Sequence, residues 1–463
     1  MIPVKFIPEY LFFRIATVLI TIVLFSGCST NFNAVRKEQA AEFNKNIADK
    51  TARVLPSDIT YDMQSCIKIA LENNLDIKIA EIKGRVAGLD RKIAFGSFLP
   101  HIDVNFTHTK DNKLQLRSAF GSYFALSDQE ATITVIEGQL SILKPETWFI
   151  YNAYKKGEDI EKLLGLRVKQ AIRLQVTALY LSCLTAESNT TALRASVEQA
   201  GALLSEMKDL YKEGLILKSD LQKTEVFLMM QQNSLSEMER QKIYARSQLL
   251  EAMGLSPLSE ITLAPAPSFT IEKKALDDMI LTALLNRPEL KIADRKVAVY
   301  GDALKMAISA FIPGITIIGS LTDNRDSYLK YHDILTYGVS GILTVFDGFA
   351  NIYQYREAKE ENTRAMIERE QTCLKIMLEV INARQTLERE DENRKLMKLE
   401  LEASESRLNE VTSLWKEGIV TSSEKLEAVS SNATAKANMA IADYRYQVAA
   451  ATTADVLGIS GKE

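Results

Sequence analysis

Histidine is scarce in this chain, and no common catalytic motif is present. The 463 residues contain three histidines, His101, His108 and His332, so a histidine-based metal or acid–base site would have few residues to use. No Walker A loop, G-x-S-x-G, C-x-x-C or H-E-x-x-H motif occurs. We therefore predict that the protein is not an enzyme and has no catalytic residue and no metal site.

An excess of one charge and long apolar runs are also missing. The 56 Lys and Arg residues nearly balance the 60 Asp and Glu residues, which gives a net charge of −4. Without a basic excess to neutralise phosphates, nucleic acid is not an expected partner. No stretch from Ser29 onward is apolar for the roughly 18 residues of a transmembrane helix, so none is predicted there.

The N-terminus has the pattern of an export signal. Basic residues flank the start of an apolar run at 15–25 that is too short to span a bilayer, which predicts a signal peptide over residues 1–27. The run ends in "LFSGC", and Cys28 resembles the acylated cysteine of a bacterial lipobox, although Phe25 stands where leucine is usual. An ordinary cleaved signal with an incidental cysteine is the alternative.

The lipobox resemblance implies a covalent lipid on Cys28, which would be the chain's only cofactor, and a lipid-anchored segment over 28–58. Ser29 rather than aspartate follows it; by resemblance to Gram-negative sorting rules, this favours the outer membrane. The other cysteines, Cys66, Cys183 and Cys373, are odd in number and far apart. They predict no disulfide framework, and we expect small buried apolar side chains.

An internal repeat organises the rest of the chain. "ALENNLDIKIAE" from Ala70 returns as "ALLNRPELKIAD" 213 positions later, and "FLPHIDV" as "FIPGITI" with the same offset. "YKEGLILKSD" from Tyr211 returns as "WKEGIVTSSE" 204 positions later, and "MGLS" as "LGIS". We predict structural repeats over 59–255 and 270–463. Between them, residues 256–269 contain three prolines and read as an extended linker.

Each repeat is predicted to contain a helical stretch, one β-hairpin and long helices. The hairpins are expected at 101–142 and 314–346, where apolar and polar residues alternate as in a half-buried sheet, with a loop at about 110–130. No glycine or proline occurs from Ala350 to Glu417. A helix of that length would be roughly 100 Å long, and it needs an antiparallel partner after Gly418 to bury its apolar stripe.

This organisation resembles the TolC-like outer-membrane efflux protein family over residues 59–461. The marks are the duplication, Pro100 and Pro313 before the strands, the "VFDGF" corner from Val345 and the paired "KEG" turns. The implied fold is mainly α with a small β part. It comprises tandem-duplicated long coiled-coil helices and two β-hairpins, which assemble as a trimeric 12-stranded β-barrel joined to a periplasmic α-helical barrel.

The function implied is a passive exit duct of a tripartite efflux system. The implied partners are two further copies of the chain, a periplasmic adaptor (membrane fusion) protein, an inner-membrane RND-type or ABC pump, and outer-membrane lipid. The implied location is the outer membrane, lipid-anchored, with a large periplasmic part. Two alternatives are an exit duct for type I protein secretion and a periplasmic coiled-coil lipoprotein scaffold without a pore.

Gly214 and Gly418 mark the points where the long helices reverse, because glycine permits the positive φ found just past a helix end. Ser219 and Ser423 are then expected to cap the returning helices. The exposed tip would bring Leu215, Ile216, Ile419 and Val420 to a partner surface. We interpret the tip as the adaptor contact, or alternatively as packing between neighbouring tips.

Glu424 and Glu427 lie three residues apart and share one helix face, and Asp220 corresponds to Glu424 in the first repeat. They are expected to act as first-turn residues that suit the helix dipole. The resemblance adds a second role, a ring of acids around the periplasmic aperture. Val420 stands where the family often has arginine, so Lys425 or Lys218 is left to supply a basic partner.

Overall fold

The structure is a computed structural model that describes residues 32–56, 59–266 and 274–459. The predicted signal peptide, Cys28 and the end of the linker lie outside these residues. The helices are α2 (Phe32–Val54), α3 (Met63–Asn73), α4 (Leu75–Gly96), α5 (Pro145–Lys212), α6 (Lys218–Ala252), α7 (Leu276–Asn286), α8 (Pro288–Ser309), α9 (Ala350–Lys416) and α10 (Ser422–Val456). The strands are β1 (Thr60–Tyr61), β2 (His101–Lys110), β3 (Leu116–Ala119), β4 (Ser122–Ala125), β5 (Glu130–Leu143), β6 (Thr262–Leu263), β7 (Gly314–Asn324) and β8 (Asp333–Ile342).

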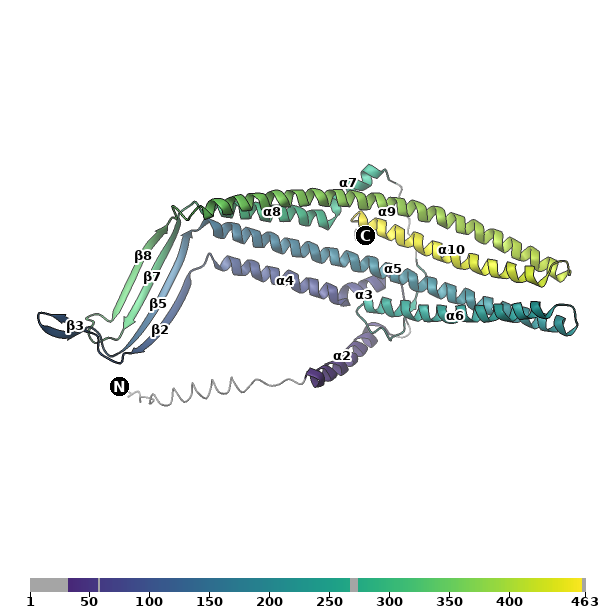
Figure 1. The fold of residues 1–463 in the computed structure, drawn as a ribbon, viewed down its shortest axis with the longest axis horizontal. Helices are drawn as coiled ribbons and strands as arrows, with labels where there is room; N and C mark the ends of the chain where they lie inside the picture. The colour runs from purple at the N-terminus through teal and green to yellow at the C-terminus, as the bar shows by residue number, and fades with distance from the viewer. Residues whose placement is uncertain (1–31, 57–58, 267–273, 460–463) are drawn as a thin grey trace.

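The long helices form an elongated bundle, and a small sheet continues it at one end (Figure 1). Helices α5 and α9 have 68 and 67 residues, which corresponds to roughly 100 Å each. Each returns as an antiparallel helix, α6 or α10, at the end far from the sheet (Figure 1). The long helices and their partners are therefore confirmed. None of the helices in the described part of the chain has the length and hydropathy of a membrane-spanning helix.

The two predicted hairpins join into one antiparallel sheet with the order β2-β5-β7-β8. Strand β5 pairs with β7, so the central contact joins the first repeat to the second. The outer edges of β2 and β8 pair with no described strand. The sheet consequently exposes two rows of backbone N–H and C=O groups, which can pair with further strands.

Two neighbouring cross-strand rows in the middle of the sheet differ in polarity and lie on opposite faces. One cross-strand row is Val104, Ile136, Leu321 and Leu335, and the next row, on the opposite face, is Asp103, Glu137, Ser320 and Thr336. The predicted alternation of apolar and polar residues is present in the strands. The prediction that the sheet is half-buried is wrong for a single chain. Every residue of β2 is exposed, and Ile102 is 67% exposed, because no helix or strand within residues 32–56, 59–266 and 274–459 covers this strand.

Two details of the hairpins differ from the sequence prediction. The stretch expected to be a loop at 110–130 contains a second small ribbon, in which β3 pairs with β4. The second hairpin ends at Ile342 and not at 346, so Val345 belongs to the corner before α9. There, Gly348 has a φ of 71°, and the Asp347 carboxylate accepts a 2.8 Å hydrogen bond from the Asn351 N–H.

The repeated motifs meet in space. In the first repeat Asn74 caps α4, and its Nδ2 donates a 2.8 Å hydrogen bond to the Ala252 carbonyl, next to "MGLS". A Cβ on Gly254 would lie 2.4 Å from the Asn73 carbonyl oxygen. In the second repeat Gly458 of "LGIS" packs in the same way against Asn286. Each glycine is required because a backbone segment passes directly over it.

The core lies around these junctions. The larger cluster of buried residues joins α3, α5 and α6, and the smaller one joins α7, α9 and α10. Cys66 and Cys183 are buried as predicted, whereas Cys373 is only partly buried. The linker is not simply extended, because β6 pairs in parallel with β1. Ala264, the linker residue that follows β6, accepts a 2.5 Å hydrogen bond from the Tyr180 hydroxyl.

Candidate functional site

The two tip turns, at the far end of the long helices, have the same backbone geometry. Gly214 has a φ of 75° and Gly418 a φ of 71°. In each turn the next residue donates back to a carbonyl near the helix end, Leu215 to Leu210 and Ile419 to Leu414, at 2.9 and 3.0 Å. This is the Schellman pattern, in which a left-handed residue closes a helix. The prediction that both glycines reverse the chain is confirmed.

The tips expose apolar side chains to solvent in the single chain. Leu215 and Ile419 are 67% and 65% exposed, while Ile216 and Val420 are partly covered. Leu217, which the sequence analysis did not select, is 70% exposed. The sequence feature that could have identified Leu217 is its position just after the glycine turn. Such a group of exposed apolar residues is suited to contact with a protein surface.

The caps of the returning helices differ from the prediction in both repeats. Helix α10 is capped by Thr421, whose Oγ1 accepts a 3.3 Å hydrogen bond from the Glu424 N–H, while Glu424 Oε2 accepts a 2.7 Å bond from the Thr421 N–H. This is a capping box. Helix α6 starts after Leu217 and has no side-chain cap. Ser219 and Ser423 each lie two residues after the N-cap position, within helices that begin one residue before them.

The acids selected from the sequence are therefore used in different ways. Hydrogen bonds from the Thr421 backbone and hydroxyl lower the pKa of Glu424. Asp220 occupies the matching place on α6 and lies 3.6 Å from the Lys223 ammonium group. Glu427 is exposed and has no hydrogen bond or ion pair with the described residues. The first-turn role of Glu424 and Asp220 is confirmed, and the aperture role stays a prediction.

A cluster of three residues joins the two helical hairpins close to the tip. Glu206 on α5 accepts a 2.8 Å hydrogen bond from Trp415 Nε1 on α9 and a 2.9 Å bond from Lys425 Nζ on α10. The Lys425 ammonium group also lies 4.8 Å from the centre of the Trp415 ring, within the range of a cation–π contact. We call Glu206, Trp415 and Lys425 the tip cluster. Lys425 therefore pairs with Glu206 within the chain, and a basic partner for the aperture acids stays a prediction.

The tip cluster stabilises the charged form of its acid. Partial burial raises the pKa of Glu206, but the hydrogen bonds from Lys425 and Trp415 and the lysine charge outweigh burial, so the pKa falls below 4.5. The Lys425 side chain is largely shielded from water, at 17% exposed, and the Glu206 side chain is half-exposed. The ion pair is thus partly screened, and the indole hydrogen bond gives it a fixed geometry.

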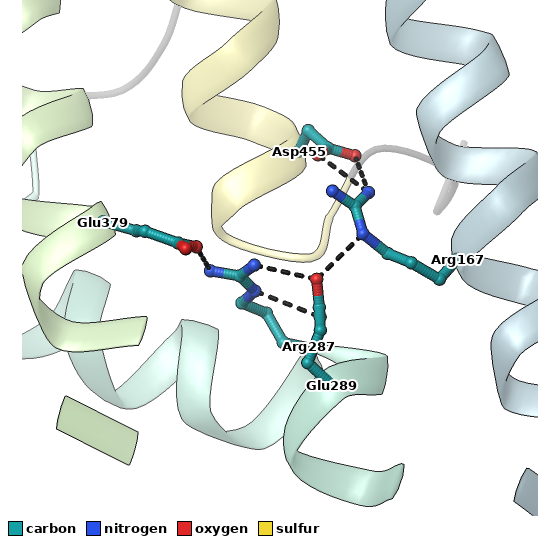
Figure 2. Close-up of polar contacts among 5 residues, drawn as sticks. All are labelled: Arg167, Arg287, Glu289, Glu379 and Asp455. Atoms are coloured by element: carbon teal, nitrogen blue, oxygen red, sulfur yellow. Dashed lines mark hydrogen bonds and ion pairs between the residues drawn. The ribbon is translucent and has the colours of Figure 1, made fainter. Parts of the chain in front are cut away.

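A second charged cluster fixes helices of the two repeats to one another (Figure 2). Arg167 of the first repeat contacts Glu289 and Asp455 of the second repeat, at 2.8 and 3.1 Å. Arg287 donates to Glu289 at 2.8 Å and also to Glu379. These five residues form the inter-repeat cluster. It links α5, α8, α9 and α10, and the sequence analysis missed it because its members are far apart in the chain.

Arg287 is the centre of this cluster and is only 6% exposed. Burial raises the pKa of the Glu289 carboxyl, but the hydrogen bonds and charges of Arg287 and Arg167 dominate and lower it. The described residues contain no group of histidine, cysteine and acid side chains that could bind a metal ion. The charged groups of the inter-repeat cluster hold the helices together, so their role is structural.

The fold is similar to the folds of solved outer membrane channels. It aligns with the Campylobacter jejuni CmeC outer membrane channel at a TM-score of 0.75 and 16% identity, over 86% of each chain. It also aligns with the outer membrane protein VceC from Vibrio cholerae at 0.74 and 13% identity, over 86% of this chain and 96% of the other.

The sequence comparisons agree with the fold. Residues 279–458 match the outer membrane efflux protein family. A curated relative, nodulation protein T from Rhizobium leguminosarum bv. trifolii, is 22% identical over 397 residues, which cover 82% of this chain and 81% of the relative. The second repeat thus matches the outer membrane efflux protein family, and the fold is similar to that of TolC-like channels, which agrees with the resemblance drawn from the sequence.

Proposed function

We propose that this protein is the outer-membrane exit duct of a tripartite efflux system. The observation that carries the proposal is an amphipathic four-stranded sheet with two open edges, continuous with two helical hairpins of roughly 100 Å. A coiled-coil scaffold has no use for such a sheet. The CmeC channel, to which the fold is similar, is described as an outer membrane channel.

Three copies would complete the barrel. The open edge of β8 in one copy can pair with the open edge of β2 in the next, and three sheets of four strands then close into 12 strands without an exposed edge. The apolar row through Val104 and Leu321 would face lipid, and the polar row through Asp103 and Ser320 would line a water-filled lumen.

The long helices would then form a periplasmic tunnel. Their exposed tips, with Leu215, Leu217 and Ile419, would bind a periplasmic adaptor protein, which connects the duct to an inner-membrane pump of the RND or ABC type. The duct itself would be passive, and the pump would supply the energy for transport.

Conductance and oligomeric state test the proposal. Purified protein should migrate as a heat-modifiable trimer and should conduct ions in a planar bilayer. Replacing Val104 with lysine on the apolar row should prevent insertion, whereas the matched Asp103→Lys change on the polar row should leave insertion intact and lower cation selectivity. A monomeric, non-conducting protein would overturn the proposal.

The acids of the returning helices supply a proposed cation-selective aperture. Three copies of Glu424 and Glu427 would place six carboxylates around the axis, and Asp220 would add a further acid in each copy. Replacing Glu424 and Glu427 together with alanine should reduce cation selectivity in bilayer recordings. Because Glu424 also caps α10, Glu424→Gln with Glu427→Gln is the control for loss of charge alone. Unchanged selectivity in both variants would remove these residues from the pore.

Acylation of Cys28 would anchor the mature N-terminus to the outer membrane. Mass spectrometry of the N-terminal peptide should detect the acyl groups, and Cys28→Ser should abolish them. An unmodified cysteine, or cleavage at another position, would favour the ordinary signal peptide.

A further inference from the structure

The ribbon formed by β3 and β4 extends beyond the outer end of the sheet, at the opposite end of the molecule from the helical tips (Figure 1). We call residues 112–127 the outer ribbon. The second repeat has no such extension, since β7 and β8 are joined by a short turn. A pore wall needs only the four long strands, so the outer ribbon calls for a separate explanation.

At the apex of the outer ribbon, Phe120 has an unfavourable backbone conformation and an exposed ring. Phe120 has a φ of 52° and Gly121 a φ of 77°, and the Phe120 side chain is fully exposed. A bulky aromatic residue with positive φ is a conformational outlier, and exposing its ring to water adds a second cost. Such a combination is a sign of function when something outside the chain covers the ring.

Apolar side chains continue along the ribbon from its apex. Tyr123 is 74% exposed, and Leu114, Leu116 and Leu126 are exposed as well. None of the residues that the structure describes covers them. The strand that precedes the ribbon, β2, also exposes an apolar side chain, Phe106.

The charge of the outer ribbon has one sign. Residues 112–127 include Lys113 and Arg117 and no acid. Neither basic residue forms an ion pair with any residue that the structure describes. Two unpaired cations beside exposed aromatic and aliphatic groups match an interface that is both anionic and apolar.

Hydrogen bonds fix the base of the ribbon to the neighbouring turn. The Asp128 carboxylate accepts hydrogen bonds from the Ser327 N–H and hydroxyl at 2.6 and 2.7 Å. In return, Asp128 N–H donates to Asp326 Oδ1 at 3.2 Å. The ribbon is therefore held at the neighbouring turn, where the headgroup layer lies if strands of 10 to 14 residues cross the hydrocarbon.

We propose that the outer ribbon docks on the anionic, phosphate-bearing lipid surface of the outer leaflet. Phe120 and Tyr123 enter the interfacial layer, and Lys113 and Arg117 contact lipid phosphates. A lid of three ribbons over the pore mouth is the competing arrangement. It would bring the unpaired cations of three copies together with no acid between them, so like-charge repulsion opposes it. The inference rests on the proposed function.

Fluorescence quenching by lipid tests the docking. Full-length Phe120→Trp protein is reconstituted in vesicles of phosphatidylglycerol and phosphatidylcholine with brominated acyl chains. The unsubstituted protein is measured in parallel, because Trp148 and Trp415 are present in both. The introduced tryptophan should be quenched and blue-shifted. Lys113→Gln with Arg117→Gln should lower the quenching about twofold. Lys330→Gln, a matched charge change in the neighbouring turn, should leave it unchanged.

The outcomes separate this inference from the proposed function, because conductance is recorded on the same vesicles. Channels that conduct while the introduced tryptophan stays unquenched would overturn the docking and leave the duct intact. Equal quenching in vesicles of phosphatidylcholine alone would overturn the role of the anionic surface. Disulfide cross-links between Ser122→Cys ribbons of one oligomer would favour the lid. Failure to insert or conduct would overturn both proposals.

Discussion

The two helical hairpins of this chain end in the same turn but are fastened in different ways. The glycine φ values and the hydrogen bonds of the turns agree closely. Yet α10 starts with the capping box of Thr421 and Glu424, and α6 starts with Leu217, which cannot cap. Asp220 keeps the acidic place of the box without its partner. Duplication thus preserved the turn, whereas the two helix starts have diverged.

The tip cluster shows the same asymmetry. The positions in the first repeat that match Trp415 and Lys425 are Tyr211 and Leu221, and the second-repeat position that matches Glu206 is Glu410. Neither a tyrosine ring nor a leucine can supply the indole N–H or the ammonium group. The tip cluster therefore attaches one hairpin to the other within the chain. The matching positions of the other repeat cannot form a second copy of this cluster.

The junctions between the repeated motifs also differ between the two repeats. The first junction is made by a neutral amide, Asn74, and a very close glycine, Gly254. The second has Arg287 at the position of Asn74 and a less crowded glycine, Gly458. One junction consequently depends on packing and the other on charge, and each can be disturbed separately.

The largest expected effect is on the first glycine. Gly254→Ala places a methyl group 2.4 Å from a backbone oxygen and should cost about 4 kcal/mol, from overpacking together with the left-handed φ. Gly458→Ala should cost about 2 kcal/mol because its neighbours are farther away. Gly418→Ala, which has the same φ and open space, is the control at about 1 kcal/mol. Denaturant unfolding in detergent measures all three, and equal values would refute the comparison.

Removal of Arg287 should come next. Arg287→Met leaves Glu379 without its partner, and we expect a loss of about 3 kcal/mol in the free energy of unfolding. Adding Glu379→Gln should recover part of that loss, because the unpaired charge is then gone. Asn74→Ala, at the matching position, should cost about 1 kcal/mol. If Arg287→Met costs no more than Asn74→Ala, the second junction does not depend on charge.

Exchanging the caps should have a smaller effect, confined to the tips. Thr421→Ala should destabilise the start of α10 by about 1 kcal/mol, and Leu217→Thr should stabilise the start of α6 by a similar or smaller amount, since Asp220 is already in place. Amide hydrogen exchange in the first turns of both helices measures this. Opposite changes are expected in the two variants. If Leu217→Thr does not slow amide exchange at the start of α6, Asp220 cannot complete a cap there.

The smallest effect should be the pH dependence of the tip cluster. The pKa of Glu206 is lowered in the folded protein, so its stabilising contribution is present above the ordinary value of 4.5 and disappears as the pH falls through the lowered pKa. Amide exchange around Glu206 should therefore accelerate in that acidic range. Glu206→Gln should remove most of this dependence, whereas Glu424→Gln, which alters the other acid with a lowered pKa at the tip, should preserve it. An unchanged pH profile in Glu206→Gln would exclude the cluster.

The features that could be predicted from the sequence are those encoded locally or by repetition. The breaker-free stretch before Gly418 predicted α9, and the matched "KEG" turns predicted both reversals. The misses have separate physical causes. The outer ribbon depends on Phe120 adopting positive φ, which a sequence gives no reason to expect outside glycine. The serines chosen as caps were close, but a shift of two residues changes which side chain faces the free N–H groups.

Sequence alone determined the duplication, the lengths of the helices and the alternating faces of the strands, because each follows from the chemistry of neighbouring residues. Only the tertiary structure decided which charges meet. Glu206 is 209 and 219 positions away from Trp415 and Lys425, and Arg167 is 288 positions away from Asp455. No local pattern selects such partners, since they are brought together only when the two repeats pack side by side and the sheet joins β5 to β7.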